Sequence, residues 1–111
     1  MEKRLVALRK LFEVEDVFGR KVRTTEHYWR KIKEEKHKEL EFGVREVIAT
    51  LKQPDEVYQS VRDEYIYLYF KGFDEGKCLI VAVKRIEERG FVVTVYQTSK
   101  PKRKGEKLWP K

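Results

Sequence analysis

The chain of 111 residues predicts one domain of the α+β class, in which two helices pack on a mainly antiparallel four-stranded sheet. Residues 44–51 carry apolar side chains at helical spacing, which indicates an amphipathic helix. Four later runs rich in β-branched and aromatic residues predict the strands: 56–62, 65–71, 77–84 and 91–98. Short, charged connections separate these runs, and short connections favour antiparallel pairing. The domain is expected to span residues 1–99, followed by a basic tail at 100–111.

The first part of the chain predicts a short helix and a hairpin. Leucines recur three residues apart within 2–10, which favours a short helix there. Residues 12–24 predict the hairpin, because valines flank Gly19 on both sides. Glycine accepts the positive φ that a tight turn requires.

Two helices follow in this prediction. Thr24 or Thr25 supplies the N-cap of the first helix, and Glu26 lies in its first turn, where an acidic residue is favourable. Gly43 separates this helix from the second, which has the clearest amphipathic pattern in the chain. Pro54 ends the second helix, because the residue before a proline is disfavoured in helical geometry. The apolar stripes are expected to be Trp29, Ile32 and Leu40 in the first helix, and Val44, Val47, Ile48 and Leu51 in the second.

Side chains alternate between the two faces of a strand, so the sequence predicts which residues fill the core. The expected core residues are Ile66, Leu68, Phe70, Leu79, Val81, Val83, Phe91, Val93 and Val95. The residues expected on the open face are Tyr65, Tyr67, Tyr69, Lys84, Thr94, Tyr96 and Thr98. A functional surface is expected on that open face.

The net charge of +7 favours an anionic partner, with nucleic acid first and an acidic protein or anionic membrane surface next. A mixed-charge surface is the alternative, because 41% of the residues are charged. Much of the excess lies in the tail, where Glu106 is the only acid. Leu108 and Trp109 predict that the end of this tail packs on the domain, although a solubilising tail is the alternative. The basic residues of the tail are Lys100, Lys102, Arg103, Lys104, Lys107 and Lys111.

The rare residue types exclude several kinds of site. Cys78 is the single cysteine, so no intramolecular disulfide forms, and His27 and His37 lack the spacing of a zinc site. Neither a metal nor another cofactor is expected. No long apolar run predicts a signal peptide or a membrane span, and a cytoplasmic location is expected. The absence of asparagine, with much lysine and glutamate, resembles proteins from hot environments.

An open sheet face with aromatic rings, hydroxyls and cations suits single-stranded RNA, although Tyr and Thr also occur there for their β-propensity alone. Metal-free RNA cleavage needs a base, an acid and a cation near the phosphate. His27 or His37 is a candidate base or acid, Tyr96 a proton donor and Lys84 the cation. Each of these residues also has an ordinary structural interpretation.

Six segments between residues 11 and 109 add a resemblance. They are LFEVEDVFGR at 11–20, Thr25 with Trp29 and Ile32, TLKQPDEV at 50–57, VK at 83–84, TVYQT at 94–98 and KGEKLW at 104–109. In this order they resemble the PBECR group, a family of small proteins of phage and mobile-element origin. The family name joins phage proteins with the barnase, EndoU, colicin and RelE-like nuclease fold.

The resemblance implies a BECR-type fold and a metal-independent ribonuclease activity. Lys84, Thr94 and Tyr96 match strand positions of the family, and His37 matches the histidine of its His-Pro-Glu turn, here His-Lys-Glu. The family often has a histidine before the isoleucine, where this chain has Lys31, so a two-histidine mechanism does not carry over. RelE-like relatives imply that the fold also works without a catalytic histidine.

The leading hypothesis is therefore a ribonuclease, in the role of a toxin or a phage or mobile-element effector. Lys84 would bind the scissile phosphate, Thr94 and Tyr96 would position it, and His37 or His27 would transfer a proton. RNA, with tRNA as one candidate, is the expected substrate, and an acidic antitoxin or immunity protein is a candidate partner. The rival hypothesis is a non-catalytic module that binds RNA or another protein on the same fold. The residues expected to bind RNA are Tyr65, Tyr67, Tyr69, Thr98, Lys100, Lys102, Arg103 and Lys104.

Overall fold

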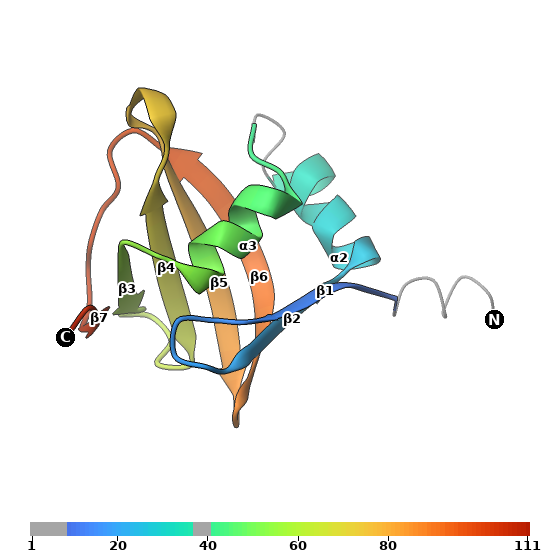
Figure 1. The fold of residues 1–111 in the computed structure, drawn as a ribbon, viewed down its shortest axis with the longest axis horizontal. Coiled ribbons are helices and arrows are strands. Elements are labelled where there is room, and N and C mark those ends of the chain that lie inside the picture. The colour runs from blue at the N-terminus through green and yellow to red at the C-terminus, as the bar shows by residue number, and fades with distance from the viewer. Residues whose placement is uncertain (1–8, 37–40) are drawn as a thin grey trace.

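The computed structural model describes residues 9–36 and 41–111 and has the predicted α+β class. Within these residues, two α-helices lie against one seven-stranded mixed sheet, with strand order β1-β2-β6-β5-β4-β3-β7 (Figure 1). The strands are β1 (Lys10–Glu15), β2 (Lys21–Thr25), β3 (Glu56–Gln59), β4 (Ile66–Gly72), β5 (Cys78–Ile86), β6 (Arg89–Thr98) and β7 (Lys107–Trp109). The helices are α2 (Glu26–Lys31), the π-helix η1 (Ile32–Lys36), α3 (Val44–Lys52) and the short 3-10 helix η2 (Asp74–Gly76).

The sheet is larger than the four strands that the sequence predicted. Strands β3 to β6 form the expected antiparallel meander. The N-terminal hairpin of β1 and β2 joins the same sheet, because β2 pairs in parallel with β6. The tail supplies β7, which pairs antiparallel with β3. The parallel pairing joins segments far apart in the sequence and β7 is three residues long, so no local pattern indicated either.

The predicted helix starts are confirmed. The Oγ1 of Thr25 caps α2 by accepting a hydrogen bond from the backbone N–H of Tyr28 at 3.1 Å. Gly43 precedes α3, and the side chain of Glu46 accepts a hydrogen bond from its backbone N–H at 2.8 Å. The expected helix at 2–10 lies almost wholly outside the described residues. Leu40, predicted in the apolar stripe of the first helix, also lies outside them.

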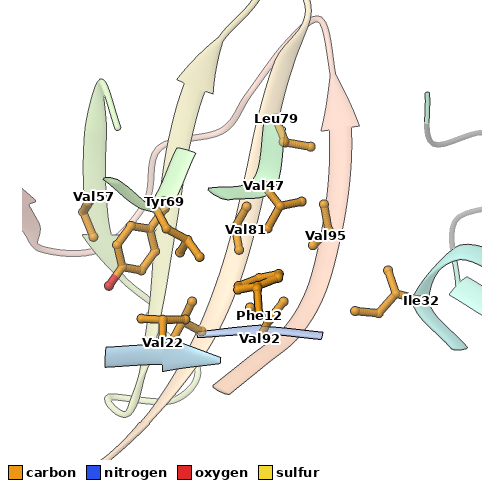
Figure 2. Close-up of a cluster of buried hydrophobic side chains, with 12 residues drawn as sticks. Phe12, Val22, Ile32, Val47, Val57, Tyr69, Leu79, Val81, Val92 and Val95 are labelled. Atoms are coloured by element: carbon orange, nitrogen blue, oxygen red, sulfur yellow. The ribbon is translucent and has the colours of Figure 1, made fainter. Parts of the chain in front are cut away.

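The main core lies between the sheet and α3, which crosses the strands in Figure 1. Its buried residues, most of them labelled in Figure 2, are Phe12, Val22, Ile32, Val47, Leu51, Val57, Tyr69, Leu79, Val81, Val83, Val92 and Val95. Each of these side chains is removed from water, and apolar burial is the main source of stability in a domain of this size. The predictions for α3 and for the core face of β5 are therefore correct.

The predicted faces of β4 are wrong. Tyr69 is fully buried in the main core and Tyr67 packs against it, whereas Leu68 and Phe70 lie in a smaller cluster with Ile80 on the opposite face. Both faces of this strand are apolar, so alternation alone could not show which one meets the helices. Burial of a tyrosine is tolerated when its hydroxyl finds a partner.

That partner comes from a buried polar cluster beside the core. The Oδ2 atom of Asp16 accepts hydrogen bonds from the hydroxyl of Tyr69 and from Nη1 of Arg85, the latter at 3.1 Å. Its Oδ1 atom accepts hydrogen bonds from the backbone N–H groups of Phe18 and Arg20. Asp16 lies in the turn between β1 and β2, so the cluster joins this hairpin to β4 and β5.

A β-bulge shifts the predicted faces of β6 as well. Ala82 pairs with Thr94 but Val83 pairs with Val92, so that Val93 is the extra residue. Val92 consequently takes the core position expected for Val93.

Candidate nucleic-acid interface

A groove of about 360 Å³ lies on the open face of the sheet, opposite the main core. Side chains of β4, β5 and β6 form its floor: Ile66, Leu68, Ala82, Val93, Thr94 and Tyr96. The β3–β4 loop and the tail form its walls: Ser60, Val61, Arg62, Asp63, Lys102 and Lys104. Four residues of the predicted site, Thr94, Tyr96, Lys102 and Lys104, therefore lie around one groove.

The groove results from the register of the strands. Leu68, Ala82 and Thr94 form one row across β4, β5 and β6. The methyl group of Ala82 is the smallest side chain in this row, so its neighbours rise above it on both sides. The groove therefore depends on a small residue within a strand of mostly branched residues.

The walls are basic. Arg62, Lys102 and Lys104 are exposed, and none of them forms an ion pair with a described residue. Asp63 is the one carboxylate among the described lining residues. An apolar floor between cationic walls suits a ligand with a flat apolar part and a negative charge.

Lys84 lies at the end of the groove next to Asp63. Its Nζ atom is 2.5 Å from Oδ2 of Asp63 and 5.6 Å from the ring centroid of Tyr65. The hydrogen bond from Lys84 lowers the pKa of Asp63, so this carboxylate is ionised at neutral pH. Loop 60–65 thus holds the cation that the sequence assigns to the phosphate.

Tyr96 lies at one end of the groove floor, and Lys84 lies just beyond the other end, beside Ile66. Tyr96 pairs with Ile80, which is four residues from Lys84 along β5, or about 13 Å at the usual strand rise. Burial raises the pKa of Tyr96 above its ordinary value, so its phenol stays protonated at neutral pH and can donate a hydrogen bond. The two side chains therefore approach a ligand in the groove from its two ends.

The three tyrosines predicted to share the open face, Tyr65, Tyr67 and Tyr69, lie on different faces of the sheet. Tyr69 and Tyr67 lie on the core side, so neither can stack on a base in the groove. Tyr65 is 56% exposed and lies beside Lys84. Of the three, only Tyr65 keeps the exposed position that the sequence predicted.

The remaining predicted binding residues lie away from the groove. Thr98 is half-buried, and its Oγ1 accepts a hydrogen bond from the backbone N–H of Lys100. Arg103 forms an ion pair with Glu56, and its guanidinium lies over the ring of Phe70 at 5.7 Å. The tail therefore contributes Lys102 and Lys104 to the groove, while Arg103 fixes the tail to the sheet.

Neither histidine lines this groove within the described part of the chain. His27 is exposed on α2, the helix that packs on β1 and β2, and it is not among the lining residues. His37 lies outside the described residues. The proton-transfer role of each stays a prediction.

Arg62 and Asp63 are groove residues that the sequence analysis did not select. Both follow the short strand β3, which ends at Gln59 rather than at residue 62 as expected. The pairing of Asp63 with Lys84 joins residues 21 positions apart, and no periodic pattern marks it. The one available signal was the small residue Ala82 in an otherwise bulky strand.

The comparisons with known proteins give no match: the chain matches no family model, no curated protein and no solved structure. Among the described residues, no helix combines the length and the hydrophobicity needed to cross a lipid bilayer.

Proposed function

We propose that the groove binds single-stranded RNA and that the chain is a metal-independent ribonuclease of the PBECR type. The observation that supports this best is the groove itself, in which an apolar floor with Thr94 and Tyr96 lies between the cations Arg62, Lys102 and Lys104. Aromatic floors accept bases, and cations beside them neutralise phosphates. The α+β class agrees with a BECR-type fold, although the sheet here is mixed and has seven strands.

In the proposed reaction the ribose 2′-oxygen attacks the neighbouring phosphorus, and the bond from phosphorus to the 5′-oxygen breaks. A base removes the 2′-proton, and an acid returns a proton to the departing 5′-oxygen, which leaves a 2′,3′-cyclic phosphate. Lys84 would leave Asp63 to bind the scissile phosphate, and Thr94 and Tyr96, farther along the groove floor, would position the strand that carries it. His37 or His27 remains the proposed proton carrier, and the Asp63 carboxylate is a further proton acceptor at the groove.

A non-catalytic RNA-binding module is the second proposal, and one observation favours it. Lys84 is neutralised by Asp63, and the described lining of the groove contains no histidine. Binding would then rest on the groove walls alone. In either case, an acidic antitoxin or immunity protein would find a complementary surface in Arg62, Lys102 and Lys104.

Incubation with total RNA and a tRNA pool in EDTA, with mapping of the product ends, tests the activity. The wild type should cleave, and Lys84→Ala should lower the rate about a hundredfold, because a cation at the developing charge is lost. His37→Ala tests the proton carrier. Lys52→Ala, an exposed lysine at the end of α3, is the matched control and should leave the rate unchanged. Intact RNA together with salt-sensitive binding would overturn the ribonuclease and leave the binding module.

A further inference from the structure

A second hollow, of about 310 Å³, lies on the same side of β5 and β6 as the groove. Three cations, Arg23, Lys84 and Arg89, line it together with Phe91. Glu87 is the one carboxylate among the described residues of its lining. The hollow therefore combines an aromatic ring with an excess of positive charge.

The parallel pairing of β2 with β6 builds this hollow. Arg23 of β2 pairs with Phe91 of β6, and Phe91 pairs with Lys84 of β5, so the three residues form one row across three strands. Neighbouring strands lie about 4.8 Å apart, which places a cation on each side of the ring. Arg89 lies two residues before Phe91 on the same face of β6 and adds a third cation.

The ring and the two arginines are available for a ligand. Phe91 is half-buried, and Tyr28 holds its ring in an edge contact with a centroid distance of 5.1 Å. Arg23 and Arg89 are exposed, and neither forms an ion pair with a described residue. Glu13, which lies opposite Arg23 on β1, is bound instead by Lys10 at 3.2 Å.

The Lys84–Asp63 ion pair lies where the second hollow meets the groove. Lys84 lines the hollow, and its partner Asp63 lines the groove. Phe91 and Tyr96 pair with β5 residues four positions apart, about 13 Å along the strand. One extended ligand can therefore contact both aromatic residues, and it passes Lys84 at the Phe91 end because Lys84 pairs with Phe91.

We propose that this hollow is a second nucleotide subsite, in which Phe91 stacks on a base while Arg23 and Arg89 bind phosphates. The inference rests on the proposed RNA binding in the groove and extends it to a single strand that runs across β4, β5, β6 and β2. A short RNA fills the groove alone. A longer RNA gains affinity from the hollow, and a duplex is excluded because its paired bases cannot reach either ring.

Fluorescence anisotropy with labelled 2′-O-methyl oligouridines tests the subsite, because these RNAs lack the 2′-hydroxyl and are not cleaved. The wild type should bind a nonanucleotide at least tenfold more tightly than a trinucleotide. The double variant Arg23→Ala with Arg89→Ala should lose that gain. The slope of the logarithm of its association constant for the nonanucleotide against the logarithm of the salt concentration should fall in magnitude by about 1.4, or roughly 0.7 for each phosphate that is no longer bound. Phe91→Leu should weaken nonanucleotide binding about tenfold without changing the salt slope.

The charge-matched control is the double variant Arg45→Ala with Lys52→Ala, which removes two exposed cations from α3. If the Arg23 and Arg89 variant binds the nonanucleotide no more weakly than this control, the subsite is overturned and the groove still stands. If the wild type binds neither oligonucleotide, the proposed RNA binding fails and the subsite fails with it.

Discussion

Lys84 and Arg85 are neighbours in β5, yet their ion pairs lie on opposite faces of the sheet. The side chains of Arg85 and Asp16 are 4% and 0% exposed, whereas those of Lys84 and Asp63 are 36% and 30% exposed. Both aspartates belong to connections between strands, so the two pairs have the same construction. Burial is the difference between them.

The difference in burial assigns different roles to the two pairs. A buried pair cannot exchange its partner for water, and breaking it leaves a charge in the core. A half-exposed pair is screened by solvent and contributes little to stability. We infer that Asp16 and Arg85 hold the hairpin on the sheet, whereas Asp63 and Lys84 can separate when an anion binds.

The largest effect is expected from Asp16→Ala on the core face. The change leaves Arg85 buried without its counter-ion and removes the acceptor of the Tyr69 hydroxyl. The free energy of unfolding should fall by about 3–5 kcal/mol, measured by urea denaturation. Asp63→Ala, the matching change on the open face, should cost far less. Equal losses of unfolding free energy in the two variants would show that burial does not give the two ion pairs different roles.

A smaller effect is expected from Ala82→Leu, which fills the groove from its floor. The larger side chain rises between Leu68 and Thr94, where the proposal places a base. Affinity for a single-stranded RNA should fall at least about tenfold, the loss of one stacked base, measured by anisotropy. Ala49→Leu on α3 is the control, since it adds the same side chain away from the groove. Unchanged RNA affinity of the Ala82→Leu variant would show that RNA does not bind in the groove.

The sequence indicated the core face of the molecule better than the open one. The amphipathic spacing of 44–51 and the threonine cap at Thr25 are local signals, and both helices begin as predicted. The prediction for the faces of β4 was wrong because apolar residues lie at both odd and even positions of this strand. Asp16, which accepts the hydrogen bond that permits burial of Tyr69, is 53 residues away in the sequence. The register shift at Val93 is likewise set by pairing with β5 and not by its own residue type.

The candidate site was predicted where the alternation of side chains along a strand held and where basic residues cluster in the tail. Thr94 and Tyr96 were found because they alternate along one strand beyond the bulge. Lys102 and Lys104 of the walls were predicted from the basic tail, whereas Arg62 and Asp63 were not, because they lie in a loop that the fold brings to the strands. The second hollow depends on the parallel pairing of β2 with β6, which joins Arg23 to Phe91 across 68 positions of the sequence.

The smallest effect tests whether the Lys84 pair is exchangeable. Asp63→Asn removes the charge that neutralises Lys84, so RNA affinity should rise about threefold to tenfold, or about 0.7–1.4 kcal/mol. The pH dependence has a defined sign. Because the folded-state pKa of Asp63 is lowered by Lys84, the carboxylate stabilises the fold above its unfolded pKa, and this contribution is lost as the pH falls through the folded value.

Acidification should therefore release Lys84 only below the ordinary carboxyl range, and at neutral pH the pair stays intact until an anion competes for the lysine. The gain in RNA affinity of the Asp63→Asn variant over the wild type should be constant from neutral pH down to about pH 5. Lys84→Ala with Asp63→Asn should return the affinity to that of Lys84→Ala alone, because the aspartate acts through the lysine. A gain that persists without Lys84 would show that Asp63 repels RNA directly and that the pair is not a switch.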